Sequence, residues 1–249
     1  MSFEANAQLS LHWLAHAWKA LTQQHHHELL PLLSTLVPND GVVIDVGAHA
    51  GQFTKLFARL AREGRVIAVE PSPYALSILR TVVRLKRLES VTIVPKGLSD
   101  RPGSLVLKSP IKRSGAVGFG LASFAAAAPA RPTRSDTVAV ETLDRLADAL
   151  RLARCDFVKC DVEGWEVKVL EGGRDVLERF RPALLVEVSP ASLARSGETP
   201  DRLWSLLAPL GYAAVRLPGD EPVAGFAGDA DYLFRPDTTS AAQAASLRR

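Results

Sequence analysis

The residues best placed to do chemistry begin in the segment VVIDVGAHAGQFT, residues 42–54. A run of β-branched residues there ends at Asp45, and Gly47 and Gly51 follow. Aspartate and glycine are unfavourable inside a regular strand or helix, so we expect a requirement outside the packing of the fold. A glycine turn between a strand and a helix lets a ligand approach the backbone, beside the partial positive charge of the helix N-terminus.

A second candidate is Glu70, at the end of the apolar strand in VIAVEPSP. An acid roughly twenty residues after a glycine turn is the usual ribose holder of nucleotide-binding α/β folds. A dinucleotide fingerprint would need glycines where His49 and Gln52 stand, and no phosphate loop ending in Gly-Lys-Ser/Thr is present. The acidic Asp45 beside the turn instead suits a cationic ligand with an amino-acid end, such as S-adenosylmethionine.

The elements that must position these residues alternate between apolar strands and helical stretches. Strands that are nearly all apolar and separated by helices indicate a parallel sheet covered on both faces. We expect strands at 42–46, 65–70, 91–95, 156–161 and 183–188, closed by a pair at 212–217 and 231–235. We expect helices at 51–62, 73–87, 165–180 and 200–209. The predicted fold class is α/β, with a mostly parallel seven-stranded sheet, an antiparallel closing strand and an N-terminal helical extension.

Three parts are expected along the chain. Residues 1–38 form the helical extension, with one or two amphipathic helices, and residues 39–236 form the main domain. Within the domain, residues 101–140 break the strand–helix alternation and predict an inserted hairpin with a mobile loop, which is often a lid or a binding loop. A surface loop without function is the alternative. Residues 237–249 are expected to be a disordered tail.

Composition excludes several classes of protein. Charges interrupt every apolar run, so no membrane span is expected, and no secretory signal is evident at the N-terminus. We therefore expect a cytoplasmic protein. The net charge of +3 is too small for the footprint of a nucleic-acid binder. Cys155 and Cys160 are expected to be buried, unpaired thiols that face opposite sides of one strand.

Six stretches together carry a resemblance to a known family. They are VIDVGAHAGQFT, VIAVEPSP, GLSD (97–100), VETLDRL (140–146), DFVKCDVEGWEVKVLEGG (156–173) and RPALLVEV (181–188). In this order they resemble the FkbM family of S-adenosylmethionine-dependent methyltransferases, which have the class I Rossmann-like fold. The pairing of TLD with the segment 156–173 is the most specific part, and the likeness covers roughly residues 40 to 190. His49 departs from the asparagine that the family often has.

The resemblance implies S-adenosyl-L-methionine as the cofactor. Its methionine end would lie against Asp45, Gly47 and Gly51, its ribose against Glu70, and its adenine near the segment after the third strand. The cofactor-binding positions implied are Asp45, Gly47, Ala48, His49, Gly51, Glu70, Pro71, Ser99, Asp100 and Asp161.

A methyl transfer needs the donor and the acceptor to be aligned, and a hydroxyl acceptor must also lose its proton to a nearby base. The resemblance places Asp161 opposite the sulfonium and the acceptor. The candidate catalytic residues are Asp161, Glu163 and Glu187, with either of the first two as general base. Lys159 is expected to share a strand face with Asp161 and to neutralise a neighbouring carboxylate, Glu187 being one candidate. Asp161 and Glu187 also permit a Mg²⁺ ion, although no clear third ligand accompanies them.

The expected function is O-methylation of a hydroxyl on a sugar, glycan, lipid-linked saccharide or secondary metabolite. N-methylation, a non-catalytic adenosyl-binding scaffold and an NAD-dependent oxidoreductase are the alternatives. The expected partner is a small-molecule or glycan substrate. A homodimer is left open, with Trp13 and Trp18 as candidates for a dimer contact or for a cover over the site.

Overall fold

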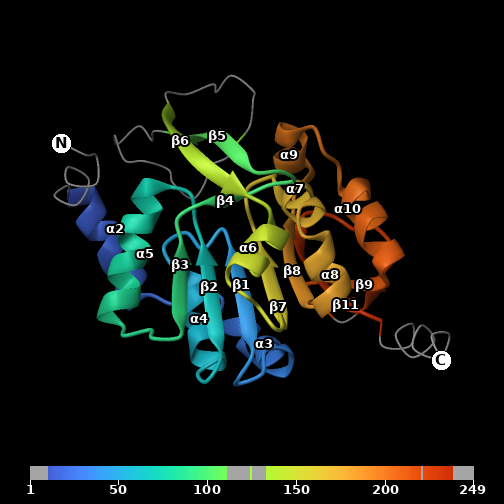
Figure 1. The fold of residues 1–249 in the computed structure, drawn as a ribbon, viewed down its shortest axis with the longest axis horizontal. Helices are drawn as coiled ribbons and strands as arrows, with labels where there is room; N and C mark the ends of the chain where they lie inside the picture. The colour runs from blue at the N-terminus through green and yellow to red at the C-terminus, as the bar shows by residue number, and fades with distance from the viewer. Residues whose placement is uncertain (1–10, 111–123, 125–132, 220, 238–249) are drawn as a thin grey trace.

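The computed structural model describes residues 11–110, 124, 133–219 and 221–237. Its main sheet has the strand order β10-β9-β11-β8-β7-β1-β2-β3 (Figure 1). These strands are β1 (Val42–Val46), β2 (Arg65–Val69), β3 (Val91–Val94), β7 (Phe157–Cys160), β8 (Ala183–Val188), β9 (Tyr212–Arg216), β10 (Pro222–Val223) and β11 (Ala230–Pro236). The strands β3, β2, β1, β7 and β8 pair in parallel, and β11 enters antiparallel between β8 and β9.

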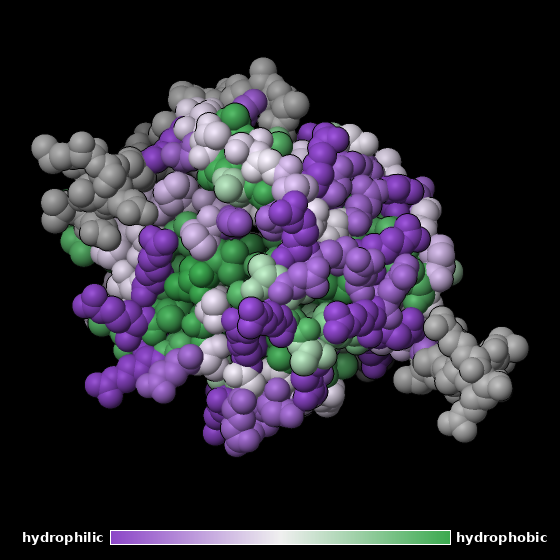
Figure 2. Space-filling view, viewed as in Figure 1, coloured by the Kyte–Doolittle hydropathy of each residue, from purple (hydrophilic) through white to green (hydrophobic). Residues whose placement is uncertain are grey.

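Helices cover both faces of this sheet (Figure 1). One face carries α3 (Leu30–Leu36), α4 (Gln52–Leu60) and α5 (Pro73–Leu85), and the other carries α6 (Leu143–Ala149), α7 (Glu166–Glu171), α8 (Arg174–Phe180), α9 (Pro190–Leu193) and α10 (Pro200–Leu207). Neighbouring strand residues point to opposite faces, so Val43 and Ile44 belong to different hydrophobic clusters. Hydrophilic residues cover α8 and α10, while hydrophobic residues are visible between α5 and α6 (Figure 2).

The predicted α/β class with a mostly parallel sheet is confirmed, and all seven expected strands are present. The sheet also has an eighth strand, because the two-residue β10 pairs with β9 at its edge. The helix expected over 165–180 is two helices. A Cβ on Gly172 would overlap the carbonyl oxygen of Ser99, and one on Gly173 would lie 2.5 Å from Leu143 Cδ2. Close packing at this glycine pair therefore explains the interruption.

A second, three-stranded sheet lies above the carboxyl ends of the main strands (Figure 1). It consists of β4 (Gly97–Leu98), β5 (Gly103–Pro110) and β6 (Thr133–Glu141), in the order β4-β6-β5. β5 and β6 pair antiparallel from Gly103 opposite Val140 to Pro110 opposite Thr133. The expected mobile loop between them lies, except for Phe124, outside the described residues, as does the expected tail from residue 238 onward.

The N-terminal segment consists of α2 (Leu11–Thr22), a 3₁₀ turn η1 (His27–Leu29) and α3. α2 packs on α5, where Trp13 Nε1 donates to Ser77 Oγ at 2.7 Å. Trp13 is therefore a core residue, whereas Trp18 is 70% exposed. Lys55 Nζ ties the segment to α4 by donating to the carbonyl oxygens of Ala20 (2.6 Å) and Gln23 (2.8 Å).

The two cysteines are buried and not bonded to each other. The prediction that they face opposite sides of the sheet is wrong, since both belong to the cluster under α6 and α8. β7 begins only at Phe157, so Cys155 lies outside the alternation of the strand. Among the described residues, none of the helices has the length and apolar character that crossing a bilayer requires.

Candidate active site

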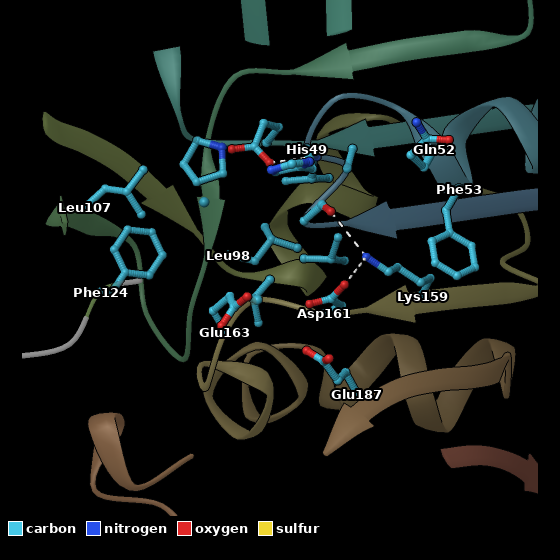
Figure 3. A pocket seen from close by; sticks show the side chains of 18 of the residues that line it. His49, Gln52, Phe53, Leu98, Leu107, Phe124, Lys159, Asp161, Glu163 and Glu187 are labelled. Carbon is cyan, nitrogen blue, oxygen red and sulfur yellow. Dashed lines mark hydrogen bonds and ion pairs between the residues drawn. The ribbon is translucent and has the colours of Figure 1, made fainter. Parts of the chain in front are cut away.

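The candidate site is a pocket of about 220 Å³ at the carboxyl ends of β1, β2, β7 and β8, under the second sheet (Figure 3). Ligands of open α/β sheets bind at this edge. Eight residues singled out from the sequence line it together: Gly47, Ala48, His49, Glu70, Pro71, Asp161, Glu163 and Glu187. The ends of separate strands thus bring these predicted residues to one place.

The glycine turn after β1 has a reason inside the fold. Gly47 has φ 76° and Gly51 has φ 87°, backbone conformations that favour glycine. A Cβ on Gly47 would overlap the carbonyl oxygen of Asp161, and one on Gly51 would lie 2.9 Å from Leu79 Cδ1. The packing of the fold itself therefore requires these glycines, and the expected requirement from a ligand stays a prediction. Gly51 itself is not among the lining residues.

Glu70 is 6% exposed and follows β2 at the pocket wall. Its Oε2 accepts from the backbone N–H of His49, and its Oε1 accepts from that of Ser72, both at 2.8 Å. Burial raises the pKa of Glu70 to about 7, against the effect of these two hydrogen bonds. Each carboxylate oxygen keeps a further lone pair with which to accept from a ligand hydroxyl.

Asp45 has no exposed surface and is not among the lining residues. It accepts from Thr54 Oγ1 at 2.6 Å, and its Oδ1 lies 3.9 Å from Lys159 Nζ. Burial raises the pKa of Asp45. Asp45 therefore lies behind the pocket wall, and the ligand contact expected from the sequence would require this network to open.

Lys159 is 4% exposed and reaches the pocket floor. Its Nζ lies 3.1 Å from Asp161 Oδ2 and donates to the carbonyl oxygen of Gly47 at 3.2 Å (Figure 3). The expected neutralising role fits this geometry, but the carboxylates within ion-pair distance are Asp161 and Asp45 rather than Glu187. Asp45 is the neighbour of Lys159 in the β1–β7 register, so their side chains share one face. Burial lowers the pKa of Lys159, but the two carboxylates outweigh it and the net shift is upward.

Three carboxylates, Asp161, Glu163 and Glu187, each bring one oxygen within 4.8 Å of the others (Figure 3). Burial raises the pKa of Asp161, but the Lys159 ammonium outweighs it and the net shift is downward. Desolvation, followed by the charge of Asp161, raises the pKa of Glu187 to about 8. Asp161 is therefore the more acidic of the two carboxyl groups, and Glu187, although its side chain is exposed, takes up a proton more readily.

The Mg²⁺ interpretation gains a third carboxylate from this cluster. However, Asp161 pairs with Lys159, and Glu163 Oε2 lies 3.4 Å from Arg195 Nη1. An ammonium 3.1 Å from one prospective ligand would repel a divalent cation. The donor set thus does not favour a magnesium site.

The turn after β7 accounts for two residues of the segment 156–173, Gly164 and Glu166. Glu166 is 2% exposed, and its Oε1 accepts from the backbone N–H groups of Val162 (3.0 Å) and Gly164 (3.1 Å). Gly164 has φ 102°, and a Cβ there would overlap the carbonyl oxygen of Ser192. These two residues shape the turn, which leaves Asp161 and Glu163 to line the pocket.

Ser99 and Asp100, expected near the adenine, lie beside the pocket and not on its wall. Ser99 Oγ donates to Asp100 Oδ1 at 2.9 Å and accepts from Trp165 Nε1 at 3.1 Å. Their neighbours Gly97 and Leu98 line the pocket instead. The segment after β3 thus reaches the pocket through Gly97 and Leu98 rather than through Ser99 and Asp100, and its contact with adenine stays a prediction.

Several lining residues were not anticipated from the sequence. His26 comes from the N-terminal segment with φ 63° and stacks on Phe53, with the ring centroids 4.5 Å apart. Leu107 and Phe124 come from the segment between β4 and β6. No spacing in the sequence marks them, because their places depend on how the two flanking segments dock on the sheet.

Residues 45–214 match the family described as the Methyltransferase FkbM domain. This match spans more than half of the chain. The chain belongs to the FkbM methyltransferase family. The FkbM match includes both Asp45 and Glu187, whereas His26 and the rest of the N-terminal segment lie outside it.

Two curated relatives of this FkbM chain are also called methyltransferases. Methyltransferase 1 of Beauveria bassiana is 27% identical over 147 residues, which cover 54% of this chain and 59% of the relative. Methyltransferase sdnD of Sordaria araneosa is 27% identical over 183 residues, which cover 62% of this chain and 67% of the relative. The match therefore spans about three fifths to two thirds of these relatives' lengths.

Among solved structures, Methyltransferase FkbM from Methylobacillus flagellatus KT superposes with a TM-score of 0.55 at 15% identity. The superposition covers 93% of this chain and 56% of that one. At this identity the likeness concerns the fold, and it confirms the Rossmann-like class expected from the sequence.

Proposed function

We propose that this FkbM chain is an S-adenosylmethionine-dependent methyltransferase that methylates a hydroxyl oxygen. The observation that carries the proposal is the shared pocket, in which Glu70 and Asp161 stand on either side of the Gly47 turn. The proposed acceptor is a small molecule or glycan: a sugar, a lipid-linked saccharide or a secondary metabolite.

The lining residues fit the parts of the proposed cofactor. The unused lone pairs of Glu70 suit the two ribose hydroxyls. The apolar groups Pro71, Leu98 and Phe124 offer a wall for a flat purine ring. The ionised Asp161 and the turn at Gly47–His49 suit the end that carries the sulfonium and the amino acid.

When bound, the sulfonium supplies a methyl group that is already activated for transfer. In the proposed step, a C–O bond forms as the C–S bond breaks, and the hydroxyl proton passes to Asp161 Oδ. The products are a methyl ether and S-adenosylhomocysteine. Alignment of the reacting groups contributes roughly 7–11 kcal/mol to such a step. Asp161 is the preferred base because Lys159 favours its ionised form, whereas the pKa of Glu187 is raised.

The test is a transfer assay with S-adenosylmethionine labelled with tritium in the methyl group. The full chain is incubated at pH 7.5 with a panel of methyl glycosides, nucleotide sugars, alcohols and amines. We expect label on the oxygen of at least one hydroxyl acceptor. Label on amines alone would replace O-methylation with N-methylation. Cofactor binding without any transfer would replace the enzyme with a binding scaffold.

A further inference from the structure

Lys159 contacts both the proposed cofactor side and the proposed acceptor side of the pocket. Its Nζ donates to the carbonyl oxygen of Gly47, in the turn beside the proposed cofactor, and pairs with Asp161 on the acceptor side. The ammonium also lies 5.2 Å from the centre of the Phe53 ring. With 4% of its surface exposed, Lys159 is held by contacts in three directions.

The charges around Lys159 are mostly negative. Asp45 of β1 lies behind it, and Asp161 lies in front at the end of β7. Beyond Asp161 stand Glu163, with Arg195 beside it, and Glu187 of β8, whose neighbour in the sheet register is Asp231 of β11. Among the residues that the structure describes, Lys159 is the cation within ion-pair distance of Asp161, so its charge affects how strongly Asp161 attracts other cations.

We propose that Lys159 is a positioning residue that holds Asp161 against the cofactor turn and balances its attraction for the positively charged methyl donor. This inference rests on the proposed function. The donor loses its positive charge during transfer, so a strong ion pair with Asp161 would stabilise the ground state more than the transition state and slow the reaction. Lys159 leaves Asp161 ionised as a base while it limits that ground-state attraction.

Two ligands that differ by one methyl group and one positive charge separate this role from a structural one. S-adenosylmethionine carries the sulfonium charge, and S-adenosylhomocysteine does not. The ratio of their dissociation constants, Kd(homocysteine form)/Kd(methionine form), therefore reports the electrostatic attraction at the sulfur. Loss of folded protein or distortion of the ribose site weakens both ligands alike and cancels in the ratio.

The experiment measures both dissociation constants by calorimetry at pH 7.5 for the full chain and its variants. In Lys159→Met we expect the ratio to rise roughly 3- to 30-fold, because a neighbouring positive charge is lost in a partly solvated pocket. Lys159→Arg should keep the wild-type ratio. The matched control is Lys168→Met, since Lys168 pairs with Glu198 at 2.8 Å and does not line the pocket.

Asp161→Asn supplies a second test if Lys159→Met does not fold. It leaves the Lys159 charge without its near partner, so the ratio should fall below that of the wild type. An unchanged ratio in Lys159→Met, or an unchanged or higher ratio in Asp161→Asn, would overturn the role of Lys159. Failure of the wild-type chain to bind either ligand would instead overturn the proposed function.

Discussion

At the scale of single residues, the environment assigns different roles to similar side chains. Asp161 and Glu187 are both carboxylates at the pocket, but Lys159 lies 3.1 Å from Asp161 and keeps it ionised. Glu187 has no such cationic partner among the described residues, and its pKa is raised to about 8. Environments that separate the pKa values of neighbouring acids are a common way to divide acid and base roles.

Asp161→Asn should therefore abolish most of the turnover. Removal of a general base typically costs 10²- to 10⁴-fold in rate, and we expect a loss in that range with the affinity for S-adenosylhomocysteine within about threefold of wild type. The measurement is the transfer rate with the best acceptor from the labelled panel. Glu187→Gln is the matched control and should lose less, because Glu187 is the weaker acid of the two and is not the proposed base. Wild-type turnover in Asp161→Asn would remove Asp161 from the mechanism.

Glu70 predicts a pH dependence of cofactor binding. Ribose hydroxyls donate to the ionised carboxylate, so affinity should be full well above pH 7 and should fall as the pH drops through the pKa of Glu70, about 7. Glu70→Gln loses charge-assisted hydrogen bonds worth about 1.5–3 kcal/mol each, and should weaken binding roughly tenfold or more. Calorimetry with S-adenosylhomocysteine between pH 5.5 and 8.5 measures both effects. The same pH slope in the wild type and in Glu70→Gln would show that another group causes it.

At the scale of elements, the strands and crossover helices follow from the apolar pattern, whereas the contacts between elements do not. The run VVIDV predicts a buried strand, and β1 spans Val42–Val46. The pattern could not show that Gly47 faces the carbonyl of Asp161, or that Gly172 faces that of Ser99, because both contacts join segments far apart in the chain. For the same reason the break between α7 and α8 and the places of His26 and Phe124 were not predictable.

The turn after β1 gives a test of stability. In Gly47→Ala the new methyl group would overlap the Asp161 carbonyl in a left-handed backbone conformation. We expect the free energy of unfolding to fall by more than about 2 kcal/mol. Gly103→Ala is the matched control, since a Cβ added there would have no atom within 4 Å apart from its own residue and its chain neighbours, and its effect should stay within about 0.5 kcal/mol. Denaturation in urea measures both, and equal stabilities would contradict the packing described for Gly47.

Hydrogen bonds from Lys55 attach the N-terminal segment to α4, and this attachment can be tested. Lys55 Nζ binds the carbonyl oxygens of Ala20 and Gln23, and burial lowers the pKa of Lys55 to about 8. Lys55→Met should leave these carbonyls without their donor and increase amide hydrogen exchange over 12–24 by about fivefold or more, equivalent to roughly 1 kcal/mol of local stability. Lys168→Met should leave this exchange unchanged. Equal protection in Lys55→Met and the wild type would show that packing on α5 alone holds the segment.

At the scale of the whole molecule, the pocket is assembled from three parts. The parallel sheet collects Glu70, Asp161 and Glu187 at one edge, because parallel strands end on the same side. The N-terminal segment adds His26, and the segment between β4 and β6 adds Leu107 and Phe124. The acids were predictable from strand order and the family resemblance. The contributions of the other two segments were not predictable, because their sequences do not show where they pack on the sheet.

The central claim is that this edge of the sheet binds an adenosyl sulfonium nucleoside. The most direct test is a set of calorimetric titrations of the intact chain at pH 7.5 with S-adenosylmethionine, S-adenosylhomocysteine and NAD. Both adenosyl compounds should bind with one molecule per chain and compete for the same site, and NAD should give no heat of binding. Binding of NAD with no response to either adenosyl compound would contradict the account.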